Sequence, residues 1–199
     1  MSESIFYFDD AAIGLSRETS HPNYNALLVK DFYFDSEDVF SPFGNGDGSE
    51  TLAELEEWYA ETAGKGEIMD FVVERMNDYG HSYNSMLLSV TITPEHIDKL
   101  MDEDEFLLPY IDDVIIATAF GQYKIAGIID APLKRLAEVA FQREEIIHRA
   151  IIANGTDTKI KFLEAKESPA RADAEIIHSR KFLSRLMIMR ADLERFEER

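Results

Sequence analysis

The chain has 199 residues, 45% of them hydrophobic, and a formal net charge of −19 at pH 7. This length and apolar content are sufficient for one substantial core and argue against intrinsic disorder. The absence of cysteine excludes a disulfide framework and a thiolate zinc site. No apolar run approaches the roughly 18 residues that span a bilayer, and no basic region precedes the N-terminal apolar patch. We therefore expect a cytoplasmic protein.

The negative charge is concentrated in the first two-thirds of the chain. Residues 1–130 contain 27 Asp and Glu against six Lys and Arg, whereas residues 131–199 contain 12 against 14. A general adaptation to high salt would spread acidic residues over the whole surface. We therefore interpret the boundary at Asp130 as a division into an acidic domain, 1–130, and a helical hairpin, 131–199, with different partners.

The beginning of the acidic domain predicts two strands followed by two helices. The apolar and aromatic content of Ser4–Phe8 and Ala26–Phe34 is typical of strands. A loop rich in Gly, Asn and Asp comes next. A capping box that begins at Thr51 then predicts a helix over 52–62, and a second helix is expected over 67–79.

The rest of the acidic domain predicts more strands. Ser85–Thr93 reads as a strand, and a short helix is expected over 94–101. Asp113–Ile129 is predicted to be two strands joined near Gly121 in a hairpin. The expected fold class is therefore α+β, with an antiparallel sheet and short helices in the acidic domain.

The last third of the chain is expected to form two long helices. An N-cap at Asp130 predicts a helix to about residue 154, where Gly155 ends it. A short strand is expected at 159–163, and a final helix over most of 169–199. This helix carries an apolar seam with alternating steps of four and three residues, which requires a second helix and predicts oligomerisation. The seam consists of Phe182, Leu186, Met189, Leu193 and Phe196.

The tetrapeptide Glu-Ile-Ile-His occurs twice, at 145–148 and at 175–178. Glu and His three residues apart share a helix face, and paired segments of this kind present ligands in ferritin-like di-iron sites. An antiparallel pair of helices would place the two histidines at similar heights. Such a site needs two further helices with a Glu each, so we predict no metal or cofactor. Metal binding by Glu145, His148, Glu175 and His178 stays an alternative.

A second carboxylate set lies on the two helices predicted over 52–79. Glu54 and Glu57, followed by Glu67 and Asp70, hold carboxylates at the spacing that two helices use to bind Mg²⁺. Over these two short segments only, the pattern resembles the all-α NTP pyrophosphohydrolases of the MazG type, which implies pyrophosphate hydrolysis. No cluster of Lys or Arg lies nearby in the sequence to hold phosphates.

The charge distribution favours a non-enzymatic acidic binding protein that engages a basic protein partner. Clustered negative charge speeds association with positive surfaces, as in an inhibitor, an immunity protein or a mimic of nucleic acid. The same charge disfavours direct nucleic-acid binding by residues 1–130. An oligomeric assembly subunit and a metal-dependent protein are the alternatives. The predicted contacts with the partner are Asp35, Glu37, Asp38, Asp102, Glu103, Asp104, Glu105, Asp112 and Asp113.

Overall fold

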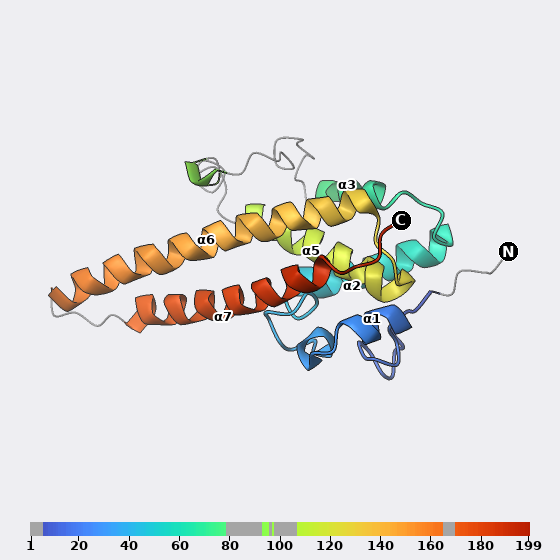
Figure 1. The fold of residues 1–199 in the computed structure, drawn as a ribbon, viewed down its shortest axis with the longest axis horizontal. Coiled ribbons are helices and arrows are strands. Elements are labelled where there is room, and N and C mark those ends of the chain that lie inside the picture. The colour runs from blue at the N-terminus through green and yellow to red at the C-terminus, as the bar shows by residue number, and fades with distance from the viewer. Residues whose placement is uncertain (1–5, 79–92, 96, 98–106, 165–169) are drawn as a thin grey trace.

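The computed structural model describes residues 6–78, 93–95, 97, 107–164 and 170–199 (Figure 1). In these residues the regular elements are helices, and the β pairing consists of two isolated bridges. The elements are α1 (Pro22–Leu27), the 3-10 helix η1 (Asp31–Phe34), α2 (Gly46–Thr62), α3 (Ile68–Asp78), α5 (Leu107–Ala126), α6 (Ala131–Glu164) and α7 (Ala170–Leu193).

The prediction of an α+β fold with an antiparallel sheet is wrong. The segment predicted as a hairpin, 113–129, forms most of α5, and 26–34 is divided between α1 and η1. The run Val114–Ile116 has the composition of a strand, but here it reflects burial of a helix on all sides. A helix without a solvated face loses the amphipathic period by which helices are recognised.

Some helices begin or end at residues other than those predicted, for local reasons. Helix α2 begins at Gly46 because the Asn45 side chain caps it, accepting the amide of Gly48 at 2.6 Å. Gly155 does not end α6, and the strand predicted at 159–163 is helical. The strand predicted over 85–93 lies outside the described residues except for its last position.

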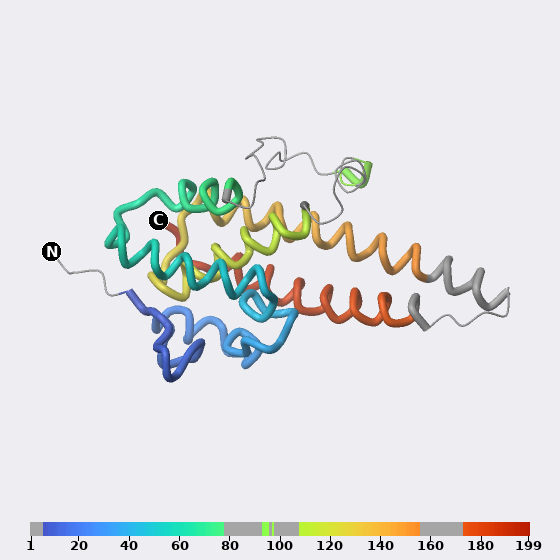
Figure 2. Tube along the Cα trace, turned by 180° about the vertical axis from the view of Figure 1, so that it is seen from behind, coloured from blue at the N-terminus to red at the C-terminus, as the bar shows by residue number. Residues whose placement is uncertain are grey.

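Helix α5 lies at the centre of the molecule, packed between α2 and α6, with α1 and α3 at its edges. From Ile111 to Ile125 every side chain except that of Asp113 is buried. Helices α6 and α7 lie side by side in antiparallel orientation and extend together to one side of the molecule (Figure 2). Of the helices in the described part of the chain, none is long and apolar enough to cross a membrane.

An aromatic cluster joins α5 to the C-terminal segments. The ring of Phe120 lies 5.0 Å from that of Phe196 and 6.3 Å from that of Phe141, between centroids. Tyr123 stacks on Phe196 at 4.0 Å, nearly parallel, and Tyr33 stacks on Phe120. The core therefore contains side chains from residues 1–130 and from residues 131–199.

Replacing the central ring of this cluster should be severely destabilising. Phe120→Ala removes a completely buried side chain that contacts rings of η1, of α6 and of the segment after α7, so we expect a loss of about 3–5 kcal/mol in unfolding free energy. Urea denaturation followed by far-UV circular dichroism measures this loss. Val29→Ala, at an exposed position, is the control and should change stability by less than about 0.5 kcal/mol. Equal stability of the two variants would contradict this packing.

Candidate functional site

The carboxylates predicted to contact a partner do not form one surface. Asp35 and Glu37 are exposed on the loop after η1. Asp38 is largely buried and accepts a hydrogen bond at 3.0 Å from Arg185 of α7. The acidic run 102–105 lies outside the described residues.

Asp112 lies inside the molecule, and Asp113 next to it is partly exposed. The Asp112 side chain is fully buried on α5, where the Arg143 guanidinium of α6 donates to both of its oxygens, from Nε at 2.9 and 3.0 Å and also from Nη2. Burial raises the pKa of Asp113 well above its usual range, with the neighbouring Glu144 carboxyl adding to the shift. A bidentate ion pair enclosed in this way holds helices together and is not accessible to a partner.

A second buried acid, Glu144, follows Arg143 directly on α6. Its Oε2 is 3.4 Å from Nε2 of His148, and Nδ1 of His148 lies 3.0 Å from the Ser179 hydroxyl of α7. Burial raises the pKa of Glu144 to about 8 and lowers that of His148 to about 4. Both shifts favour the uncharged forms near neutral pH, and the hydrogen bond between α6 and α7 here is the one that joins His148 to Ser179.

The repeated Glu-Ile-Ile-His segments bring their histidines together but not their glutamates. The His148 and His178 ring centroids are 6.4 Å apart. Glu145 instead pairs with Arg149 at 2.7 Å and with Arg190 at 3.3 Å. In the described residues no group of three His, Asp or Glu side chains is arranged to hold a metal ion.

The apolar seam of α7 packs within the chain. Four of its side chains are buried, and they belong to the same core as the rings around Phe120. The remaining one, Phe182, is half-buried against Phe40 and His148. The helix that this spacing requires is supplied by the chain itself.

Exposed carboxylates gather on a different surface, formed by α2 and α3. Helix α2 contains no Lys or Arg, and its exposed acids recur every three or four residues, so they share one side. We call this surface the acidic face. It consists of Glu50, Glu54, Glu57, Glu61, Glu67, Asp70 and Glu74.

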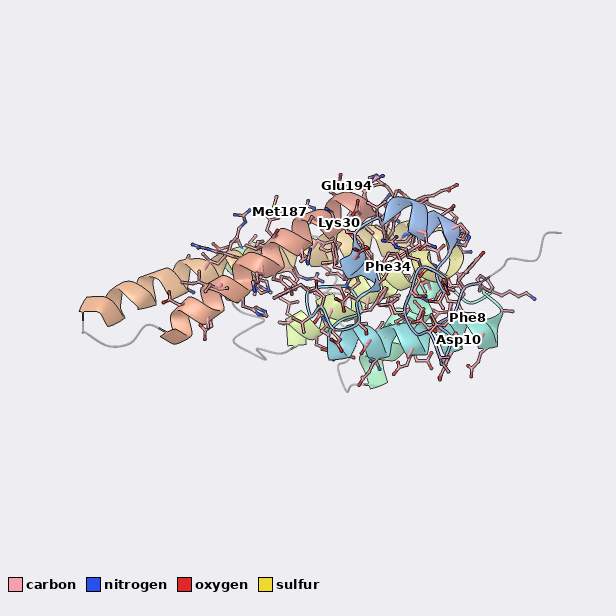
Figure 3. The ribbon with its side chains drawn as sticks, turned by 90° about the horizontal axis from the view of Figure 1, so that it is seen from below. Phe8, Asp10, Lys30, Phe34, Met187 and Glu194 are labelled. Carbon is pink, nitrogen blue, oxygen red and sulfur yellow. The ribbon has the colours of Figure 1, made fainter. Side chains whose placement is uncertain are left out.

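Two cations accompany these seven carboxylates. Arg75 of α3 is 3% exposed and binds Glu54 at 2.5 Å and Glu50 at 3.4 Å, so it joins α3 to α2 beneath the surface. Lys65 is exposed in the turn between the two helices. Figure 3 shows α2 along one border of the molecule, near Phe8 and Asp10 and away from Met187 and Glu194.

Four members of the acidic face were singled out in the sequence for a different reason. Glu54, Glu57, Glu67 and Asp70 are the set that resembles the pyrophosphohydrolase pattern. In the structure Glu54 is bound by Arg75, and the other three are exposed. The sequence feature that indicates the complete acidic face is the regular spacing of Glu50, Glu54, Glu57 and Glu61. These four residues share one helix only because α2 starts at Gly46.

Comparisons with known proteins supply a relative but no activity. No protein-family model and no solved structure matches the chain. It is similar to the uncharacterized protein YfeS of Escherichia coli (strain K12), with 30% identity over 158 residues, which is 78% of this chain. The match spans 63% of YfeS, less than two-thirds of that relative's length.

The buried Glu144 predicts a pH-dependent stability. Its folded-state pKa, about 8, is above the unfolded value near 4.3, so the folded protein keeps a proton that the unfolded chain releases, and stability falls as pH rises between these values. His148 has the opposite effect, but only below about pH 6.5. Burial also raises the pKa of Asp112 and Asp113, which act in the same direction as Glu144. From about pH 6.5 to 8 we therefore expect the unfolding free energy to fall, by about 1–2 kcal/mol for each proton that the folded protein keeps.

Glu144→Gln should reduce this decline, because the amide has no proton to release. Urea denaturation at several pH values between those limits measures the slope. Glu18→Gln, at an exposed position, should keep the slope of the unchanged protein. A Glu144→Gln slope equal to that of Glu18→Gln would show that Glu144 is ionised in the folded state.

Proposed function

We propose that the chain is a non-enzymatic binding protein of the cytoplasm, which engages a basic protein partner through the acidic face of α2 and α3. The observation that carries the proposal is the excess of seven carboxylates over two cations on these two helices and the turn between them, one of the cations being buried. Clustered charge of one sign accelerates encounter with a surface of the opposite sign and fixes its orientation.

The acidic face is unfavourable for the helices that carry it. Glu57 and Glu61 are four residues apart on α2, and a like-charged pair of this kind destabilises a helix by about 0.2–0.5 kcal/mol. A surface that serves solubility alone is better made with both signs interspersed. A bound basic partner would relieve this repulsion.

The other exposed acidic loop is a weaker candidate, because arginines neutralise it. Asp31 pairs with Arg17 at 3.1 Å, and Asp38 pairs with Arg185 at 3.0 Å. Both arginines line the same shallow depression as Asp35 and Glu37. The local excess of negative charge is therefore smaller there than on the acidic face.

Neutralising the acidic face should abolish partner binding. The test variant combines Glu57→Gln, Glu61→Gln, Asp70→Asn and Glu74→Gln, which leaves the two acids that pair with Arg75 in place. Immobilised protein is incubated with host lysate at low and at high salt, and captured proteins are identified and titrated. We expect a basic protein that the unchanged chain retains at low salt only, and that the variant does not retain.

A second variant separates the acidic face from net charge. Gln at Glu18, Glu138, Glu194 and Glu197 removes the same four charges from other parts of the surface. This control should retain the captured protein. Equal loss of binding in both variants, or no basic protein captured by the unchanged chain, would refute the assignment of the interface.

A further inference from the structure

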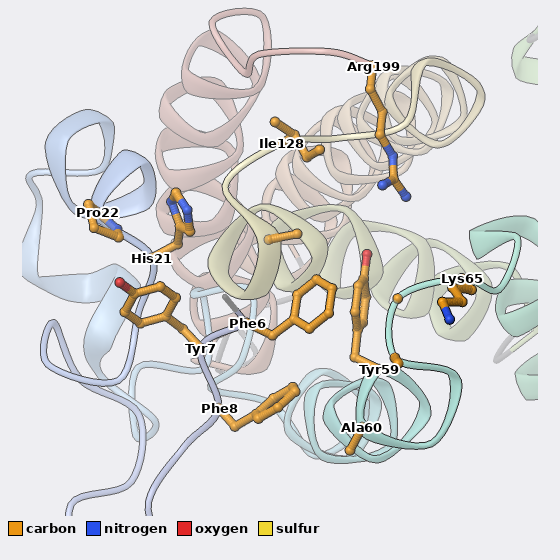
Figure 4. Close-up of a pocket in the computed structure, with 13 residues that line it drawn as sticks. Phe6, Tyr7, Phe8, His21, Pro22, Tyr59, Ala60, Lys65, Ile128 and Arg199 are labelled. Carbon is orange, nitrogen blue, oxygen red and sulfur yellow. The ribbon is translucent and has the colours of Figure 1, made fainter. Parts of the chain in front are cut away.

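A pocket of about 1070 Å³ lies beside the acidic face, between the extended residues 6–8, the start of α1 and the end of α2 (Figure 4). Aromatic rings form its apolar wall, and cationic side chains lie at one end. Figure 4 shows Phe6 and Tyr59 facing each other at the centre, with Lys65 and Arg199 on the side away from Tyr7. The volume is at the upper end of the range for small-molecule sites.

The aromatic wall is held in place by buried contacts. The backbone amide of Tyr7 donates to the carbonyl of Ile125 at 3.0 Å, and that of Asp9 donates to the Glu56 carboxylate at 3.0 and 3.1 Å. The fully buried Lys124 then binds both Asp9 and Glu56 at 2.8 Å. Residues 6–9 are thus tied to α5 and to α2, and the rings that they carry are fixed before any ligand arrives.

Two glycines allow rings to lie directly on the backbone of the pocket. Gly64 and Gly127 have φ of +67° and +70°, which few other residues adopt without strain. A Cβ atom at Gly64 would overlap the Phe6 ring, and one at Gly127 would overlap the His21 ring. The shape of the pocket therefore depends on both positions.

The polar groups of the pocket are hydrogen-bond donors. Tyr59 is 1% exposed, and its hydroxyl oxygen accepts from Gln122 Nε2 at 3.0 Å, so its proton is left without an acceptor in the described residues. Nδ1 of His21 accepts the Asn23 amide at 3.0 Å, which places the ring proton on Nε2. Burial lowers the pKa of His21 and so favours this neutral form.

Two cations complete the set of donors. Arg199 donates from Nε and Nη2 to Asp130, which leaves the two Nη1 hydrogens available. Lys65 is exposed and has no carboxylate partner in the described residues. None of the thirteen lining residues is an acid, in a chain that contains 39 Asp and Glu. The pocket thus combines an apolar wall with free hydrogen-bond donors and has no carboxylate among its lining side chains.

We propose that this pocket binds a small organic anion, whose planar aromatic body packs against Phe6, Tyr7 and Phe8. Its carboxylate or phosphate head group accepts hydrogen bonds from Arg199, Lys65 and the Tyr59 hydroxyl. Flat rings suit an aromatic wall because offset and edge-to-face contacts add to the burial of apolar area. An anionic head group satisfies the free donors of Arg199, Lys65 and Tyr59. This inference is independent of the proposed partner at the acidic face.

Calorimetric titration with naphthoate, naphthyl phosphate and the uncharged naphthamide tests the ligand class. We expect saturable binding of at least one anion and about tenfold weaker binding of naphthamide, because charge-assisted hydrogen bonds are the stronger ones. Comparison of the two anions distinguishes a carboxylate site from a phosphate site. Equal binding of all three compounds, or no saturable binding of either anion at millimolar concentration, would overturn the proposal.

Variants locate the binding site on the intact chain. Ala60→Trp places a ring into the pocket from an exposed position of α2 and should abolish binding, whereas Ala53→Trp, exposed on the same helix outside the pocket, should leave it unchanged.

Variants of the donors test the head-group contacts. Lys65→Gln should weaken the affinity for the anion about threefold to fivefold, with Lys30→Gln as its matched control. Tyr59→Phe should weaken it about fivefold. Binding that survives Ala60→Trp unchanged would place the anion elsewhere and reject this pocket.

Discussion

Helix α5 is enclosed on all sides and nevertheless carries ionisable side chains, and the rest of the structure is arranged to satisfy them. Asp112 near its start requires Arg143 of α6, and Lys124 near its end requires Asp9 and Glu56. Removing one partner of such a buried pair typically destabilises by about 3–5 kcal/mol, because the remaining charge is left unpaired. These two ends therefore fix how α6, α2 and the N-terminal segment pack around α5.

This arrangement also separates the carboxylates into two populations. Those in contact with α5 are buried and are paired or protonated, as Asp112 and Glu144 are. Those on the outer sides of α2 and α3 have two cations near them, and one of these, Arg75, is buried between the two helices. The excess of exposed negative charge on the acidic face thus follows partly from where the few basic side chains are needed.

Helices with a solvated face were predictable from the sequence, and the enclosed helix was not. The helix predicted over 52–62 falls within α2, but the capping box at Thr51 is wrong, because Asn45 caps the helix and the Thr51 hydroxyl is buried without a hydrogen-bond partner in the described residues. The apolar run of α5 lacks a polar face, so its composition suggested strands, and Asp112 and Asp113 were then assigned to a surface. The misassigned helix therefore placed the buried Asp112 among the predicted surface contacts.

Tertiary partners account for the rest of the difference. The register of two antiparallel helices indicated that His148 and His178 would lie at similar heights, and their rings are close. The direction of Glu145 could not be predicted in this way, because it depends on Arg149 and on Arg190 of the facing helix. Spacing along a helix determines which side a residue occupies, but the facing side chains decide what it binds.

The glycines beneath the Phe6 and His21 rings have a consequence for comparing this chain with its relatives. A larger residue at Gly64 or Gly127 would move one of these rings, even if every other lining residue were identical. The two positions therefore act as a compact signature of the pocket. A relative that has glycine at both and an aromatic ring above each should share its shape, whereas one that lacks either glycine has a different cavity whatever its overall identity.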